Sequence, residues 1–207
     1  MSANRPDMPP LRSSELDSDP IEQFNSWWKT AKAEVPLAEA MTLATVDEIG
    51  APDARMVLLK GFDERGFRFF TNYESAKSLQ LEASASAALI LYWRELDRQV
   101  RIRGSVSRLD EDESDEYFAS RPRESQIGAW ASPQSRSLSN RTLLDRRVEG
   151  VTERFSDSAI ARPPFWGGYL LRPERIEFWQ GQVGRLHDRF LYLRSDAGAW
   201  TFERLGP

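Results

Sequence analysis

The stretch Arg175–Arg189, RIEFWQGQVGRLHDR, decides the fold that we predict for this chain. Its first five residues alternate charged and apolar side chains, which is the period of a β-strand. Gly181 and Gly184 supply a turn, and Asp188–Leu193 can return as the antiparallel partner strand. The stretch therefore predicts a hairpin that carries an indole, an imidazole and guanidinium groups near one end: Trp179, His187, Arg185 and Arg189.

These side chains suit a planar, anionic ligand that carries a phosphate. Guanidinium groups match the geometry of a phosphate, and an aromatic face covers a ring. The imidazole among them is the only one in the chain. A solvated hairpin with a structural tryptophan accounts for the same residues, so both interpretations stay open at this point.

The segments outside the hairpin predict more antiparallel strands. Strand patterns separated by short turns or helical segments occur along the whole chain, at Met41–Val46, Arg55–Leu59, Phe67–Thr71, Ala87–Trp93, Arg98–Leu109, Phe165–Leu171, Ile176–Trp179 and Trp200–Leu205. Regular alternation of strand and helix is absent. We therefore predict an α+β fold built on an antiparallel barrel.

Helical patterns interrupt the strands. A capping residue, a proline and a glutamate begin a helix at Asp19. Ser75–Ala85 predicts a second helix with Leu79 on its buried side, and Asp110–Arg121 predicts a third with an acidic start. Pro122–Ser137 predicts a polar loop. Ser139–Phe155 predicts a last helix with four aliphatic side chains facing inward: Leu143, Leu144, Val148 and Val151.

Composition restricts the class of protein. The length of 207 residues suits one domain, at residues 19–207, after a flexible tail at residues 1–18. A net charge of −4 argues against nucleic acid as a partner. Without cysteine and with one histidine, neither a disulfide nor a metal site is expected, so redox chemistry needs an organic cofactor. No apolar run approaches the roughly 18 residues of a membrane span, and we expect a cytoplasmic protein.

One phosphate site is indicated near the start of the second helix. Arg55–Lys60 is a strand segment with a cation at each end, which also fits a solvated strand. Thr71–Lys77 joins a strand to the helix, where hydroxyls, free helix N–H groups and the Lys77 ammonium suit a phosphate.

A second phosphate site is indicated after the third helix. Tyr117 and Arg121 are four residues apart on one helix face, and Ser125 follows the proline that must end the helix. Hydroxyl and guanidinium groups together bind phosphate. Gln99, on the polar face of a strand, and Gln134-Ser135 in the loop offer further polar contacts, although Gln99 is better explained by a surface position.

Seven segments, in this order, resemble the pyridoxamine 5′-phosphate oxidase family: RMVLLK, FFTNYESAK, RQVRIRG, YFASRPRESQIGAW, FWGGY, RIEFWQG and RLHDRFLY. The resemblance extends from about Asp19 to Pro207. Its most specific part is the pair SRPRESQIGAW and EFWQG followed by RLHDRF.

The resemblance implies an FMN-binding split β-barrel, antiparallel with flanking helices, and a homodimer with its flavin sites at the subunit interface. It implies flavin contacts at Arg55, Met56, Val57, Leu58, Leu59, Lys60, Phe70, Thr71, Lys77, Gln99, Gln134, Ser135, Trp179 and Arg189. It implies substrate contacts at Lys60, Tyr117, Arg121, Ser125, Arg185, Leu186 and His187, with Arg185 and His187 as the catalytic pair.

The sequence departs from the family pattern at three places. Ala76 stands where the family usually has arginine, so Lys77 carries more of the charge and weaker FMN binding is expected. Ala3 and Pro6 stand about where relatives have an arginine and a tyrosine that fold over the substrate. Phe70 replaces a frequent tyrosine, which matters less if the contact is made by its backbone.

The activity that the resemblance implies is FMN-dependent oxidation of pyridoxine or pyridoxamine 5′-phosphate to pyridoxal 5′-phosphate. Molecular oxygen accepts the electrons and hydrogen peroxide is released. Two alternatives remain open: a related flavin oxidase of another ring substrate, such as a phenazine precursor, and a split-barrel flavin-binding module without turnover. The predicted phosphate site, or phosphate grip, at Tyr117, Arg121 and Ser125 argues against a substrate that lacks phosphate.

Overall fold

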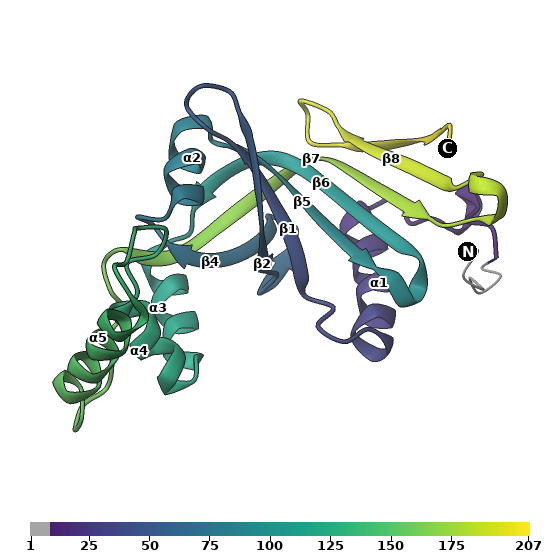
Figure 1. Cartoon of the computed structure of the whole chain (residues 1–207). Helices are drawn as coiled ribbons and strands as arrows, with labels where there is room; N and C mark the ends of the chain where they lie inside the picture. The colour runs from purple at the N-terminus through teal and green to yellow at the C-terminus, as the bar shows by residue number, and fades with distance from the viewer. Residues whose placement is uncertain (1–8) are drawn as a thin grey trace.

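The computed structural model describes residues 9–207, in which the strands form one antiparallel sheet. The strands are β1 (Ala40–Val46), β2 (Pro52–Leu58), β3 (Gly61–Asp63), β4 (Gly66–Asn72), β5 (Ser86–Trp93), β6 (Arg98–Arg108), β7 (Trp166–Gln180), β8 (Asp188–Arg194) and β9 (Trp200–Leu205). Their order is β2-β1-β5-β6-β7-β4-β3, and β8 and β9 extend from β7. The sheet is strongly bent (Figure 1), and its two ends, β2 and β3, do not pair, as expected for a split barrel.

The core lies inside the bend, beneath helix α1 (Pro20–Glu34). Alternate residues of the central strands are buried there, as in the pattern of β6, in which Val100 and Ile102 are fully buried. Trp27 of α1 packs edge-on against Phe178 at 5.2 Å between ring centroids. The predicted start of α1 is confirmed, because the Asp19 side chain accepts a hydrogen bond of 2.8 Å from the backbone N–H of Ile21.

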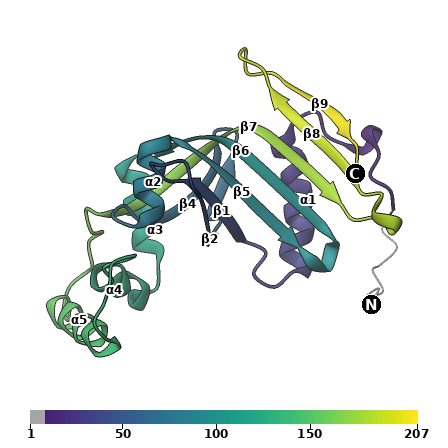
Figure 2. The ribbon, with the colours of Figure 1, turned by 45° about the horizontal axis from the view of Figure 1, so that its top comes forward.

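The remaining helices gather away from α1. Figures 1 and 2 show α3, α4 and α5 at one end of the molecule and the β7–β8 hairpin at the other. Their bounds are α2 Ala76–Ser84, α3 Glu111–Ser120, α4 Arg123–Ala131 and α5 Arg141–Arg154, with short 3-10 turns at Ser13–Glu15, Arg94–Leu96 and Val183–Arg185. A second apolar cluster lies at this end, formed by Phe118, Ile127, Phe155, Ile160 and Trp166.

The prediction of a polar loop at Pro122–Ser137 is wrong, because α4 occupies most of it. Pro122 is the N-cap residue, and Glu124 lies in the first turn, where a negative charge is favourable. Ile127 and Ala131, four residues apart, are buried against the second cluster. The polar residues on the other faces of α4 hid this short apolar stripe.

Two predicted helix orientations are also wrong. In α2, Leu79 is 61% exposed, and Ser78 and Leu81 are the buried residues. The hydroxyl of Ser78 donates to the carbonyl of Asn72 at 2.7 Å, which turns this side of α2 inward. In α5 no residue is buried, since this helix packs mainly on α4. Leu143 and Val148 are exposed, and Val151 is partly buried against the second cluster.

The predicted hairpin is confirmed, although β7 is one strand where two were predicted. Gln180 pairs with Asp188 and Arg175 with Leu193, as the strand pattern required. Pro173 interrupts β7 without ending it, because a register shift at Gly104 of β6 accommodates it. A Cβ at Gly104 would lie 1.9 Å from the carbonyl oxygen of Arg172, so only glycine fits there.

Residues 9–18, which lie in the predicted tail, pack on the C-terminal strands. Leu11 is 7% exposed, and its N–H donates to Asp188 at 2.9 Å. Arg204 donates to the carbonyl of Leu11 at 2.8 Å, and the Tyr192 hydroxyl donates to the carbonyl of Asp17 at 2.7 Å. These contacts join residues 9–18 to the folded domain. Residues 1–8, including Ala3 and Pro6, lie outside the described part of the chain.

Candidate active site

A cavity of about 560 Å³ lies where β2 and β4 meet α3 and α4. It brings together many of the predicted site residues. Those from the predicted flavin set are Met56, Val57, Leu58, Lys60, Phe70, Thr71, Lys77 and Gln134. Those from the predicted substrate set are Lys60, Tyr117, Arg121 and Ser125. Both predicted phosphate grips therefore open into one pocket.

The charge of this pocket is one-sided. Lys60, Lys77 and Arg121 line it, and no aspartate or glutamate is among the described residues that do. The chain as a whole is acidic, with a net charge of −4. A cationic cavity in an acidic protein favours an anionic ligand, because the ligand supplies the negative charge that the lining residues lack.

Lys77 occupies one side of the pocket. Its ammonium donates to the hydroxyls of Thr71 at 3.1 Å and Ser75 at 3.0 Å, and to the amide oxygen of Gln134 at 3.0 Å. All of these partners are neutral. Burial, together with the nearby Arg55, lowers the pKa of Lys77 to about 8. An anion bound beside it would stabilise the charged form and raise this pKa.

Arg121 occupies the other side. It caps the C-terminus of α3, and its guanidinium lies over the Trp166 ring at 4.5 Å from the centroid. Its Nη1 is buried and has no hydrogen-bond partner, the one such side-chain nitrogen or oxygen in residues 9–207. Burial lowers the pKa of this guanidinium. A buried donor without a partner is costly, so a ligand acceptor is expected here.

Aromatic rings form the wall between α3 and the sheet. Tyr117 stacks on Phe70 of β4 with 3.9 Å between centroids, and Phe70 stacks in turn on Trp166 at 5.7 Å. A Cβ at Gly168 would lie 2.7 Å from the Phe70 ring, which explains the glycine beside it. Trp166 was not among the predicted site residues. Its position before two strand glycines was the signal of a close approach.

Three residues of the predicted flavin set lie near the cavity without lining it. Arg55 donates to the carbonyl of Leu43 at 3.1 Å and to Gln80, and it pairs with Asp53. The side chain of Leu59 is in the core. Ser135 lies in a turn with a φ of 67° directly after Gln134.

The remaining predicted residues lie at the β7–β8 hairpin, at the opposite end of the molecule from α3 (Figure 1). Gln99 pairs with Trp179 across β6 and β7, and Trp179 pairs with Arg189 across β7 and β8. Arg185, Leu186 and His187 follow in the turn, with Leu186 71% exposed. Within a single chain, the predicted site residues therefore form two groups, one at the cavity and one at the hairpin.

His187 is oriented within the hairpin. Its ring lies 4.6 Å from that of Trp179, and its Nδ1 accepts a hydrogen bond of 3.1 Å from the backbone N–H of Gln182. Because Nδ1 is the acceptor, the neutral ring carries its proton on Nε2. His187 therefore offers a donor at Nε2.

Family models match almost the whole described chain. The model "Pyridoxamine 5'-phosphate oxidase" matches residues 28–155, and "Pyridoxine 5'-phosphate oxidase C-terminal dimerisation region" matches residues 166–207. The chain belongs to the pyridoxamine 5′-phosphate oxidase family. The predicted family and the predicted class of oxidoreductase are thereby confirmed.

Curated relatives support the same assignment. A pyridoxine/pyridoxamine 5′-phosphate oxidase of Rubrobacter xylanophilus is 55% identical over 95% of this chain and 91% of its own length. One of Salinibacter ruber is 52% identical over 95% of this chain and 93% of its own.

Solved structures share the fold. PhzG from Burkholderia lata 383, in complex with tetrahydrophenazine-1-carboxylic acid, superposes with a TM-score of 0.89 at 32% identity, over 95% of this chain and 98% of its own. A pyridoxamine 5′-phosphate oxidase-related, FMN-binding protein of Nostoc punctiforme has a TM-score of 0.74 at 20% identity, over 91% of this chain and 98% of its own. The predicted split-barrel fold is confirmed.

Residues 9–207 contain no cluster of three or more His, Asp or Glu side chains that could hold a metal ion. Within the same residues, no helix has the length and apolar character needed to cross a membrane.

Proposed function

We propose that this protein oxidises pyridoxine 5′-phosphate or pyridoxamine 5′-phosphate to pyridoxal 5′-phosphate with FMN as cofactor. The observation that carries this proposal is the unpartnered Nη1 of Arg121 in a cationic pocket that has no carboxylate among its described lining residues. A phosphate ester supplies both the acceptor and the negative charge that this site lacks.

The Lys77 side of the pocket fits FMN. The Lys77 ammonium is held by neutral oxygens only, and the start of α2 lies beside it, so a phosphate there would meet a cation and free N–H groups. Met56, Val57 and Leu58 of β2 give this side an apolar strip for a ring system. We assign the flavin phosphate to Lys77 and the ring to β2.

The Arg121 side fits the phosphate of the substrate. Lys60 faces the pocket with Tyr117 and Ser125, which add hydroxyl donors to the two cations. Two separate grips in one cavity suit a phosphorylated cofactor and a phosphorylated substrate held together. Holding both rings in the correct orientation is the main contribution of the protein to the rate.

The missing half of the site is supplied, in this proposal, by a second copy of the chain. The hairpin with Trp179 and His187 lies far from the cavity of its own chain, and the family model that covers it is named for dimerisation. In a homodimer, Gln99, Trp179 and Arg189 would contact the flavin bound by the other copy. Arg185, Leu186 and His187 would contact its substrate.

FMN, when bound, supplies the acceptor for the hydride that leaves carbon C4′ of the substrate. Arg185 orients the substrate by its charge, and His187 donates a hydrogen bond from Nε2 to the oxygen or nitrogen on that carbon. Oxygen takes up the electrons and leaves as hydrogen peroxide. The alcohol yields the aldehyde directly, and the amine yields it after water replaces nitrogen, which is lost as ammonia.

Two other functions fit the fold. The similarity to PhzG, at 32% identity, favours a phenazine-type oxidase, but a substrate without phosphate leaves Arg121 unsatisfied. A flavin-binding module without turnover would need only the Lys77 half of the pocket.

A single assay separates these functions. The purified protein is mixed with FMN and, in separate samples, with pyridoxine 5′-phosphate, pyridoxamine 5′-phosphate or tetrahydrophenazine-1-carboxylic acid, and the product absorbance and the peroxide are followed. Equal amounts of aldehyde and peroxide are expected with the two phosphorylated substrates. Flavin binding without any product supports the binding module, whereas oxidation of the phenazine acid alone supports the phenazine-type enzyme.

A further inference from the structure

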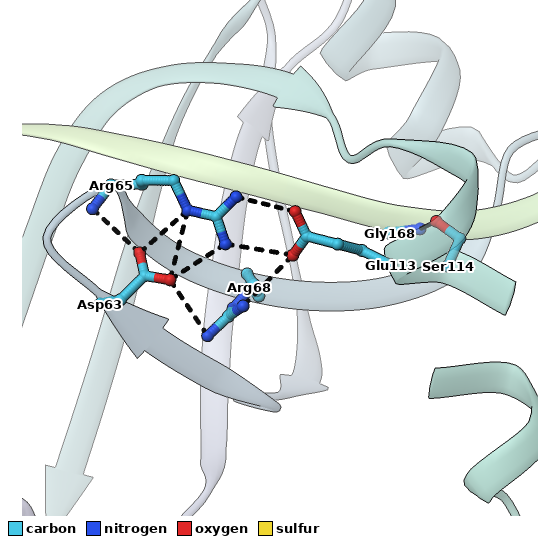
Figure 3. Close-up of polar contacts among 6 residues, drawn as sticks. All are labelled: Asp63, Arg65, Arg68, Glu113, Ser114 and Gly168. Atoms are coloured by element: carbon cyan, nitrogen blue, oxygen red, sulfur yellow. Dashed lines mark hydrogen bonds and ion pairs between the residues drawn. The ribbon is translucent and has the colours of Figure 1, made fainter. Parts of the chain in front are cut away.

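Figure 3 shows a network of four charged side chains, Asp63, Arg65, Arg68 and Glu113, none of which lines the pocket. Arg65 binds both carboxylate oxygens of Glu113, at 2.8 and 3.2 Å, and also pairs with Asp63 at 3.0 Å. Arg68 bridges the same two acids, with 3.2 Å to Glu113 and 3.3 Å to Asp63. Hydrogen bonds from the two arginines contribute to a lowered pKa of Glu113. The network joins the β3–β4 hairpin to the first turn of α3.

One arm of this network leads to Lys60. The strand β3 begins at Gly61, directly after Lys60, and the backbone N–H of Lys60 donates to the carbonyl of Arg68 at 2.9 Å. A Cβ at Gly61 would lie 3.0 Å from the Arg68 guanidinium, so the side chain of Arg68 packs against this turn. Arg68 therefore fixes the backbone on which Lys60 stands.

The other arm leads to Arg121. Glu113 is four residues before Tyr117 and eight before Arg121, so the three lie along one face of α3 and its cap. On the facing strand, Arg68 and Phe70 are two residues apart and share a face. Arg68 pairs with Glu113, and one helical turn later Phe70 stacks on Tyr117.

A neighbouring hydrogen bond holds the same turn of α3. The hydroxyl of Ser114, which is buried, accepts from the backbone N–H of Gly168 in β7 at 3.1 Å, as Figure 3 also shows. Glu113 pairs with Arg68 of β4, and Ser114 accepts a hydrogen bond from Gly168 of β7. The start of α3 is therefore attached to two strands. The far end, with Arg121, rests on the Trp166 ring.

We propose that Glu113 is a positioning residue, which, through Arg65 and Arg68, sets the separation between Lys60 and Arg121 and thereby the affinity for a phosphate ester. The identity of the ligand rests on the proposed function. Neither Glu113 nor its two arginine partners line the cavity, so they act only through the residues that do. Each of these ion pairs is a quarter to a half exposed and adds little to stability, which leaves positioning as their main effect.

The test measures binding of pyridoxal 5′-phosphate to the FMN-loaded protein by quenching of tryptophan fluorescence. Glu113→Gln keeps the size of the side chain and removes its charge. We expect its Kd and the substrate KM to rise by a factor of about 3 to 10, with kcat within about twofold and FMN retained. Asp145→Asn, which removes the exposed pair with Arg141 on α5, is the matched control and should change nothing.

The reference variants keep the outcomes distinct. The double variant Arg65→Met/Glu113→Gln should bind the ligand no more weakly than either single variant. Arg65→Lys, which keeps the positive charge, should bind it more tightly than Arg65→Met does. Arg121→Met should weaken binding more than any network variant. If Arg121→Met has no effect, the proposed substrate site is wrong. If Arg121→Met weakens binding while Glu113→Gln changes only the melting temperature, the positioning role is overturned.

Discussion

The pocket and the β7–β8 hairpin are both rich in cations, and they use them in opposite ways. In the hairpin, Arg189 pairs with Glu177 at 2.8 Å, and Asp188 pairs with Arg204 of the neighbouring strand β9. In the pocket, Lys77 meets neutral oxygens and one nitrogen of Arg121 meets nothing. A cation with a carboxylate holds the fold together. A half-buried cation left without one, at a cost to the ligand-free protein, marks where an anion binds.

The largest effect is expected in the hairpin turn, where Arg185 is exposed and belongs to the proposed reaction. Arg185→Ala should lower kcat by about a hundredfold, because a charged group beside the reacting carbon is lost. FMN retention should be unaltered, as measured by flavin absorbance after gel filtration. An unchanged kcat would remove Arg185 from the reaction and leave the hairpin with a structural role only.

Arg121→Met should act on substrate affinity. Loss of a charged hydrogen bond costs about 1.5–3 kcal/mol, which raises KM by a factor of roughly 10 to 150. The melting temperature of the ligand-free protein should not fall, because the donor that is removed had no partner there. Arg204→Met is the contrasting change: it leaves Asp188 without its cation and should lower the melting temperature. Equal thermal effects would contradict the comparison.

The pH dependence should reveal Lys77. Its pKa of about 8 in the folded protein is below the usual value, so between pH 8 and 10.5 the unfolded chain binds more protons. The ligand-free protein should therefore gain stability from this group as pH rises through that window. FMN affinity should fall over the same range as the ammonium is lost.

Lys77→Met distinguishes the contribution of the Lys77 ammonium from that of the other titratable groups. It should abolish the Lys77 part of both pH trends, measured by thermal unfolding and by flavin titration. Identical pH profiles for the variant and the natural protein would assign the trends to other residues.

The smallest effect concerns Arg103 and Arg175, which face each other directly across β6 and β7. Neither forms an ion pair within the described chain. Arg103→Gln should raise the free energy of unfolding by a few tenths of a kcal/mol at low salt, and the gain should vanish at high salt. Arg101→Gln, which breaks the ion pair with Glu177, should lower the free energy of unfolding. A loss of stability in Arg103→Gln would show that another group compensates this arginine.

The sequence predicted what is local. Alternation in RIEFW and glycines in the turn gave the β7–β8 hairpin, and the Asp19 cap gave the start of α1. Residues close together in the sequence determine such elements, so the elements can be predicted without knowledge of the tertiary structure. The motif resemblance, in turn, pointed to residues that the structure brings into one cavity.

The errors come from contacts between elements, which the helix and strand patterns do not record. Leu79 follows the helical pattern, but a hydrogen bond from Ser78 to Asn72 turns the other side of α2 inward. Trp166 gains its place from Arg121, which precedes it by 45 positions and belongs to another element. The division of the site between the pocket and the hairpin is a property of the folded sheet, which no local pattern records.

The buried carboxylate of Asp188 binds both ends of the described chain, through Leu11 at one end and Arg204 at the other. Arg204 lies in β9, after all the other strands of the sheet. During synthesis, the segment next to His187 therefore cannot reach its final state until β9 has left the ribosome, whereas α1 and the first strands can form much earlier. Loss of β9 would leave a folded barrel with a loosened hairpin.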